Sequence, residues 1–191
     1  MTVIILLLLS TIIAAVLPVP SHASAETADR LNRAITEIQA NVVFIRHATA
    51  PGFGDPPDFV IDDCASQRNL DENGRQQAAA IGRSIQAAGI QFSGIFSSQW
   101  CRCKETAVYL ALGDWQEFAG LNSFFQGLVD RDETMQLLEE KFARLKPAPD
   151  DLLLLVTHQV VINAVTGISP PSGGLVVYNT QTGARQAVWL E

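Results

Sequence analysis

The sequence predicts a single α/β domain in which helices flank a largely parallel sheet. Short β-branched or aliphatic runs alternate along the chain with segments of helical periodicity, and this alternation is typical of layered α/β domains. The 191 residues contain no internal repeat and no low-complexity tract. That length supports one hydrophobic core and is short for two, so we expect one domain.

An apolar leader opens the chain. Residues 4–17 are uncharged and mostly apolar, in a run too short and too early for a membrane span. The Ala23-x-Ala25 pair that follows fits a signal peptidase, so we predict a signal peptide over residues 1–25 and a mature domain over residues 26–191. No Lys or Arg precedes the run, which keeps an uncleaved anchor open as the alternative. In both cases we expect a periplasmic or secreted domain. If the leader is cleaved, no stable membrane span remains.

In the first half of the expected domain, the sequence predicts a helix, a strand, an irregular segment and a second helix. Residues 26–40 carry apolar side chains at helical spacing, and residues 42–45 form a β-branched run typical of a buried strand. Residues 48–67 are rich in Pro, Gly and Asp, which predicts a long irregular segment of the kind that usually serves function. We call this segment the excursion. Asp71 is expected to cap a helix that runs to about residue 88.

The second half continues the alternation of strands and helices. We expect strands at residues 95–96 and 152–156, helices at residues 100–110 and 133–145, a helical turn toward Val165, and edge strands at residues 175–178 and 187–189. The run at residues 152–156 is the clearest strand pattern in the sequence. Two of these strands end next to unusual polar residues.

Cationic or imidazole side chains follow directly after three predicted strands. Arg46 and His47 end the first, Arg102 follows the second by a short turn, and His158 ends the third. Because ligand sites form at the carboxyl ends of parallel strands, we expect these side chains to meet. The chain as a whole is acidic, with 13 Lys+Arg against 20 Asp+Glu and a net charge of -7, so nucleic acid is excluded as a partner. A compact cationic site in an acidic protein suits a phosphoryl group.

Four motifs occur in a set order along the chain. They are Phe44-Ile45-Arg46-His47-Ala48, Asn69-Leu70-Asp71-x-x-Gly74-Arg75-x-x-Ala78, Ser97-Ser98-x-x-x-Arg102-x-x-x-Thr106-Ala107 and Leu155-Val156-Thr157-His158. Together they resemble the signatures of the histidine phosphatase superfamily, in its phosphoglycerate mutase-like branch 1. The resemblance covers nearly the whole mature chain. It implies a phosphoglycerate mutase-like fold and a histidine acid phosphatase-like phosphoric monoester hydrolase.

The resemblance also assigns roles to the site residues. It implies that His47 is the nucleophile, phosphorylated in the course of the reaction, and that Arg46, Arg102 and His158 bind the phosphoryl oxygens. Water then hydrolyses the phosphohistidine. No metal and no other cofactor is expected, because side chains supply the positive charge. Arg68 and Arg75 flank the excursion, which leaves contact with the substrate open, but we interpret both as surface charges, and Lys104 with Glu105 as a solvated pair.

The sequence departs from the family pattern at two places. Ala48 replaces the usual glycine, which is a minor change. Mutase-like members carry an acidic Leu-x-Glu segment that protonates the leaving oxygen, whereas the similar segment here is Leu121-Asn122-Ser123-Phe124-Phe125. The candidates for a replacement acid are Asp55, Asp58, Asp62, Asp63 and Glu117. A site without an acid would favour substrates with good leaving groups.

The expected substrate follows from export and from the missing glutamate. Small phosphohistidine phosphatases of this superfamily also lack that glutamate, but their protein substrates are cytosolic. We therefore expect a small phosphorylated substrate or an envelope glycan phosphate. The alternatives are a phosphohistidine (protein) phosphatase and a non-catalytic phosphate or phosphosugar binding module of the same fold.

Three cysteines in an oxidising compartment predict one disulfide and one free thiol. Cys101 and Cys103 diverge by roughly 200° if they share a helix, so Cys64 is expected to pair with one of them. The family usually has a small residue at the position of Cys103, which implies that this side chain is buried. We therefore favour a Cys64–Cys101 bond over Cys64–Cys103, with the bond holding the excursion over the site.

Overall fold

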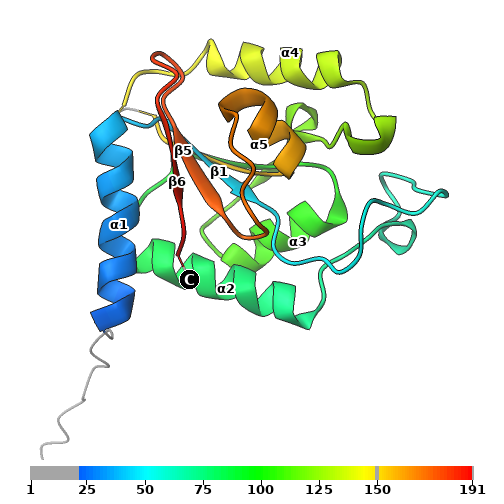
Figure 1. Cartoon of the computed structure of the whole chain (residues 1–191), viewed down its shortest axis with the longest axis horizontal. Helices are drawn as coiled ribbons and strands as arrows, with labels where there is room; N and C mark the ends of the chain where they lie inside the picture. Colours follow the sequence, from blue (N-terminus) through cyan, green and yellow to red (C-terminus); the bar gives the residue numbers. More distant parts are fainter. Residues whose placement is uncertain (1–21, 149–150, 191) are drawn as a thin grey trace, which may run out of the picture.

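Six strands form one mixed sheet between two layers of helices in the computed structural model, which describes residues 22–148 and 151–190 (Figure 1). The strands are β1 (Val42–Arg46), β2 (Gly94–Ser97), β3 (Gln116–Glu117), β4 (Leu153–Thr157), β5 (Leu175–Tyr178) and β6 (Arg185–Val188). The α-helices are α1 (His22–Ile38), α2 (Glu72–Ala87), α3 (Cys101–Leu110), α4 (Arg131–Phe142) and α5 (Gln159–Thr166). Short 3-10 helices lie at η1 (Cys64–Ser66), η2 (Ala119–Leu121) and η3 (Phe125–Gly127).

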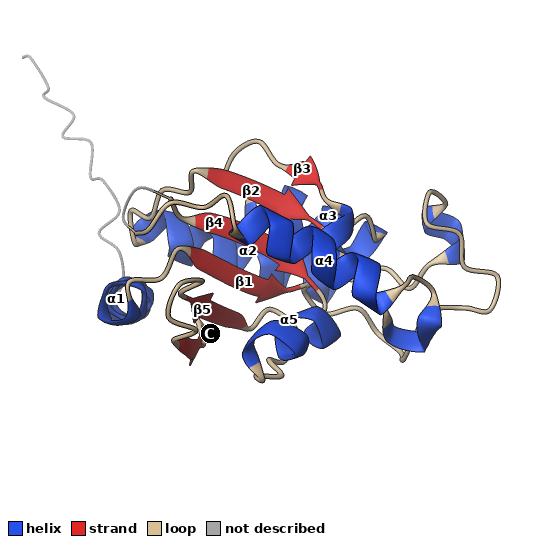
Figure 2. Cartoon of the chain, turned by 90° about the horizontal axis from the view of Figure 1, so that it is seen from above, coloured by secondary structure: helices blue, strands red, loops and turns tan. Residues whose placement is uncertain are grey.

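The strand order β3-β2-β4-β1-β5-β6 has parallel pairing from β3 to β1 and antiparallel pairing from β1 to β6. The sheet is thus largely parallel, as predicted. Figure 2 shows the excursion extending beyond the ends toward which the arrows of β1, β2 and β4 point. Parallel strands ending together bring the residues that follow them to one edge of the sheet.

The alternation of side chains along β1 explains the two-layered core. Val43 and Ile45 pack on the face covered by α1, α2 and α3, while Val42 and Phe44 pack on the face covered by α4 and α5. In β4, Leu154 packs on the first of these faces, and its neighbours Leu153 and Leu155 pack on the second. A strand buried on both faces needs a continuous apolar run, which is why β1 and β4 are so clear in the sequence.

Most of the predicted elements are confirmed, with shifted ends. Asp71 caps α2 as expected, with its carboxylate accepting from the backbone N–H of Gly74 at 2.8 Å. The helix predicted at residues 133–145 begins at Arg131, because Asp130 supplies the N-cap. Two predictions about strands were incomplete. The two-residue β3 was missed, and the predicted edge strand β5 lies inside the sheet because β6 pairs with its outer side.

The leader prediction falls mainly outside the described residues. The structure describes nothing before residue 22, and the expected cleavage point between residues 25 and 26 lies within α1. In the described part of the chain, no helix combines the length and apolar character needed to cross a bilayer.

The excursion is fastened to the start of α3. Cys64 and Cys101 form the disulfide that was favoured, with Cα atoms 5.7 Å apart, and Cys103 is a buried free thiol. Phe59 stacks on the Trp100 ring at a centroid distance of 4.9 Å. Gln67 accepts a hydrogen bond from the backbone N–H of Cys101 at 2.9 Å. Although irregular in backbone, the excursion is therefore a packed loop with a defined course.

Candidate active site

His47 follows β1 and lies at the carboxyl end of the sheet as an uncharged imidazole. Its side chain is buried, and Nδ1 lies 2.8 Å from the carbonyl oxygen of Ala48. Since a carbonyl only accepts, Nδ1 carries the proton and Nε2 retains its lone pair. Burial lowers the pKa of His47 well below its ordinary value, and the charge of Arg102 lowers it further. The imidazole is therefore neutral and able to attack through Nε2.

His158 occupies the N-cap position of α5, and it lies beside His47 because β4 pairs with β1 in parallel register. The backbone N–H of His47 donates to the carbonyl oxygen of Thr157 at 2.9 Å, and the two imidazole centroids are 5.4 Å apart. Burial first, and the charge of Arg102 second, lower the pKa of His158 well below its ordinary value. Both histidines are therefore neutral.

A buried network fixes the orientation of His158. The hydroxyl of Ser98 donates to Oδ1 of Asn122 at 3.1 Å, which leaves its oxygen to accept from Nε2 of His158 at 3.0 Å. Nδ1 of His158 then faces Arg102, with Nη2 3.4 Å away. Asn122 belongs to the segment where the family pattern has its acid. Here that segment positions an imidazole instead of supplying a carboxylate.

Three arginines gather around the two histidines. Arg46 donates through Nη1 to the carbonyl oxygen of Pro170 at 3.0 Å, and Arg68 donates through Nε to that of Gly54 at 2.8 Å. Among the described groups, Nε of Arg46 and Nε of Arg102 are buried and have no hydrogen-bond partner. Buried donors without partners are costly, so both guanidinium groups retain unused hydrogen-bonding capacity in the folded protein.

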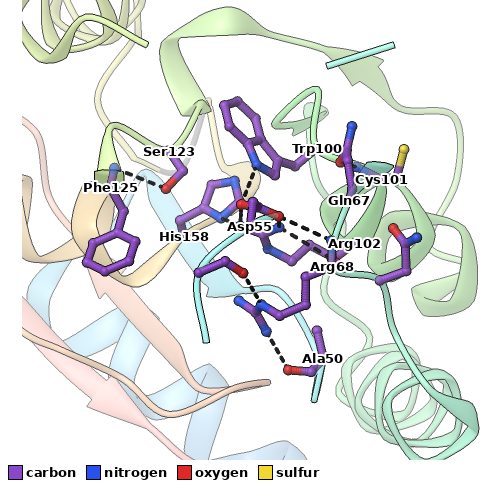
Figure 3. A network of polar contacts seen from close by, with 12 residues as sticks. Ala50, Asp55, Gln67, Arg68, Trp100, Cys101, Arg102, Ser123, Phe125 and His158 are labelled. Atoms are coloured by element: carbon purple, nitrogen blue, oxygen red, sulfur yellow. Dashed lines mark hydrogen bonds and ion pairs between the residues drawn. The ribbon is translucent and has the colours of Figure 1, made fainter. Parts of the chain in front are cut away.

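Asp55, from the excursion, is the counter-ion of Arg102 (Figure 3). Its two carboxylate oxygens lie 2.7 and 3.1 Å from Nη1 and Nη2 of Arg102, and both side chains of the pair are almost fully buried. The carboxylate also accepts from Nε1 of Trp100 at 3.0 Å and from the backbone N–H of Arg68 at 3.2 Å. Burial alone would raise the pKa of Asp55, but the hydrogen bonds and charge of Arg102 outweigh it and lower the pKa. An ionised, fully engaged carboxylate orients Arg102 and cannot act as the acid.

The other acid candidates lie away from the site. Asp58, Asp62 and Asp63 are exposed on the excursion, where Asp63 caps η1. Glu117 forms an ion pair with Lys104 at 3.2 Å. In the part of the chain that the structure describes, no carboxylate lines the cavity next to His47. The five candidates for a replacement acid are thus unsupported by the geometry.

That cavity has a volume of about 660 Å³ and two chemically different ends. Its inner part is formed by both histidines with the guanidinium groups of Arg46, Arg68 and Arg102. The outer part is lined by Phe53 of the excursion, Ser123, Phe124 and Phe125 near η3, Arg131 of α4, and Asn163 of α5. The inner part matches a phosphoryl group in charge and in hydrogen-bond donors.

The structure corrects two interpretations of charged residues. Arg68 is not a surface charge, because it lines the cavity, and it also donates through Nη1 to the carbonyl oxygen of Ala50. Lys104 pairs with Glu117 and not with its neighbour Glu105, which lies 3.8 Å from Arg75 instead. The sequence did not decide in favour of Arg68 as a site residue because it lies at the end of an irregular segment, where no periodicity shows which way a side chain points.

The described residues hold no group of three or more His, Cys, Asp or Glu side chains placed to bind a metal ion. The positive charge of the site comes from guanidinium groups. The arrangement can bind a phosphoryl group, align it with Nε2 of His47 and stabilise the negative charge on its oxygens.

Comparisons with known proteins agree with this geometry. The family model of the histidine phosphatase superfamily (branch 1) matches residues 42–147, which is more than half of the chain. The chain therefore belongs to the histidine phosphatase superfamily, branch 1.

One curated relative is an uncharacterized protein of Picosynechococcus, 32% identical over 116 residues. That match covers 61% of this chain and 64% of the relative, so the chain spans slightly less than two thirds of the relative's length.

Similar solved structures confirm the phosphoglycerate mutase-like fold. Mycobacterial glucosyl-3-phosphoglycerate phosphatase has a TM-score of 0.54 at 16% identity, covering 78% of this chain and 98% of that one. SixA from Agrobacterium tumefaciens, a proposed phosphohistidine phosphatase, has a TM-score of 0.53 at 19% identity, covering 79% and 97%. At these identities the likeness describes the fold alone.

Proposed function

We propose that this chain is a phosphatase that hydrolyses a phosphomonoester through a phosphohistidine formed at Nε2 of His47. The observation that carries the proposal is the neutral His47, whose Nδ1 is held by Ala48 while its Nε2 is free beside three arginines. Three guanidinium groups and one carboxylate, that of Asp55, leave two positive charges. This balance matches a phosphoryl dianion.

The residues of the site have separate tasks in this reaction. Arg46, Arg68 and Arg102 donate to the phosphoryl oxygens and align the phosphorus with His47. His158 lies at the same end of the cavity, with its Nδ1 3.4 Å from Nη2 of Arg102, and completes the binding site for the phosphoryl oxygens.

The test is turnover of p-nitrophenyl phosphate by the purified protein in the presence of a chelator. His47→Ala should abolish turnover, and a rapid acid-free denaturing quench with radiolabelled substrate should trap label on the wild-type chain only. Arg75→Ala, which removes an arginine outside the cavity, is the matched control for Arg102→Ala and should retain activity. Full turnover by the His47→Ala variant contradicts the assignment. Binding of phosphate without turnover of any ester indicates a binding module instead.

We further propose that the domain acts in the periplasm or is secreted. The Cys64–Cys101 bond supports this, because structural disulfides persist in oxidising compartments. The natural partner is then a small phosphorylated molecule or an envelope glycan phosphate. Amino-terminal sequencing of the exported protein tests the leader, with Glu26 as the expected first residue.

One observation favours a second candidate function, a phosphohistidine (protein) phosphatase. No carboxylate among the described residues lines the cavity, and imidazole is a leaving group that departs without a dedicated carboxylic acid. Incubation with a phosphohistidine-bearing protein distinguishes the two activities. Dephosphorylation faster than that of any ester would favour the second candidate.

A further inference from the structure

Three phenylalanines surround the outer part of the cavity, and they come from two segments far apart in the sequence. Phe53 belongs to the excursion, while Phe124 and Phe125 belong to the segment around η3. The rings of Phe53 and Phe125 meet edge to face, with centroids 5.3 Å apart and planes at 85°. The guanidinium of Arg131 lies 5.7 Å from the centroid of Phe124. Together Phe53, Phe124 and Phe125 form what we call the aromatic rim.

Two rings of the aromatic rim, Phe53 and Phe125, are exposed in a way that core packing does not explain, whereas Phe124 is partly buried against the core. Phe53 is 90% exposed and Phe125 is 39% exposed. Exposed apolar side chains gathered at the mouth of a cavity are typical of a ligand-binding surface. Burial of these rings against a ligand would remove their apolar surface from water and so contribute hydrophobic free energy to binding.

The side chain of Gln126 links the two segments that carry the aromatic rim. Oε1 of Gln126 accepts from the backbone N–H of Asp55 at 2.7 Å, and its Nε2 lies 3.3 Å from the carbonyl oxygen of the same residue. Gln126 adopts a left-handed backbone with φ of +66°, an unfavourable conformation for a residue other than glycine. Strain of this kind persists where the surrounding contacts demand it. The spacing between Phe53 and Phe125 is therefore set by the fold.

The inner part of the cavity restricts the leaving group independently. No carboxylate among the described residues lines it, and Asp55 is ionised and bound to Arg102. A leaving oxygen must therefore depart without a carboxylic acid to protonate it. A phenolic oxygen, with a pKa of about 10, departs far more easily than an alkyl alkoxide.

Both observations select the same substrate class, and we infer that this site takes aryl phosphate monoesters, with the aromatic ring of the leaving group bound by the aromatic rim. The inference rests on the proposed function, since it names the substrate class of the same site. In the first step Nε2 of His47 forms a bond to phosphorus while the P–O bond to the ring breaks, and the aryloxide takes the electron pair. Water then attacks the phosphohistidine, the P–N bond breaks toward His47, and the water proton neutralises the aryloxide.

Three probe substrates separate the ring from the leaving-group pKa. Phenyl phosphate has a ring and a leaving group of moderate pKa. Acetyl phosphate has a good leaving group and no ring, and glycerol 3-phosphate has neither. We expect kcat/KM for phenyl phosphate to exceed that for glycerol 3-phosphate by roughly 100-fold or more, the range of effects that an acid normally supplies.

Variants of the aromatic rim test the binding of the ring. Phe53→Ala and Phe125→Ala should each lower kcat/KM for phenyl phosphate by roughly 3- to 10-fold, as expected for the loss of one aromatic contact, and should leave acetyl phosphate unchanged. Val108→Ala, an exposed apolar position on α3 outside this cavity, is the matched control and should change neither.

The outcomes distinguish the inference from the function on which it rests. If acetyl phosphate is hydrolysed through His47 while the rim variants leave phenyl phosphate unaffected, the inference is wrong and the proposed function stands. A preference for glycerol 3-phosphate over phenyl phosphate has the same meaning. If no probe is hydrolysed and no phosphohistidine forms, both are overturned.

Discussion

The Asp55–Arg102 pair allows a prediction whose magnitude follows from its burial. The two side chains are 3% and 4% exposed, and the carboxylate accepts hydrogen bonds from Arg102, Trp100 and the backbone of Arg68. Asp55→Asn keeps the shape but removes the charge, which leaves Arg102 buried beside the other arginines without a counter-ion. Breaking a buried pair from one side costs about 3–5 kcal/mol. We expect the free energy of unfolding to fall by that amount.

Urea denaturation measures this loss, and a second substitution shows its origin. Arg102→Met on the Asp55→Asn background removes the uncompensated charge and should recover most of the stability, giving a strong coupling in a double-mutant cycle. Inorganic phosphate should stabilise the Asp55→Asn variant more than the wild type, because phosphate supplies the missing negative charge. A loss below about 1 kcal/mol, or no recovery in the double variant, would refute the reasoning.

Further predictions concern the buried histidines and the cysteines. Because burial lowers the pKa of His47 and His158, the folded protein binds fewer protons than the unfolded chain below pH 6.5. The free energy of unfolding should therefore fall as the pH drops below 6.5, by up to about 1.4 kcal/mol per pH unit for each histidine, and His158→Gln should reduce this slope in urea denaturation. An unchanged slope would mean that His158 is charged in the folded state. The Cys64–Cys101 bond closes a loop of 37 residues, so Cys64→Ser should lower the free energy of unfolding by about 4 kcal/mol, and a loss near zero would show that the loop is ordered without it. Burial raises the pKa of Cys103 to about 12, so Ellman's reagent should find no thiol in the folded protein and one after unfolding without reductant, whereas three would disprove the disulfide.

The inner part of the site was predictable from the sequence because it follows strands. Runs such as Val42–Ile45 identify a buried strand by composition, and the residues at its end must then lie at the edge of the sheet. This places His47 and His158 at the same edge of the sheet before any coordinates are known, and the parallel pairing of β1 with β4 then brings them side by side.

The partners of these residues could not be predicted, because they come from irregular segments in which apolar side chains follow no periodic pattern. Asp55 was one of five acid candidates, and nothing in an irregular loop shows that it folds back to Arg102. Arg68 was interpreted as a surface charge for the same reason. The two-residue β3 is too short to give an alternating pattern, so the pairing that draws Glu117 toward Lys104 was also missed. The choice of Cys101 over Cys103 as the partner of Cys64 depended on the resemblance, which implied a buried position for Cys103.

The pairing of β1 with β4 has a consequence for how the protein folds. His47 and His158 are separated by most of the domain in sequence, yet the backbone of one bonds to the residue before the other. Closing such a large loop is slow, and its entropic cost precedes any gain from the contacts it makes. While β4 is still inside the ribosome, β1 cannot pair with it. The part of the chain that has emerged then contains only one of the two imidazoles. The pair of imidazoles at the carboxyl end of the sheet therefore forms late, as a property of the completed sheet.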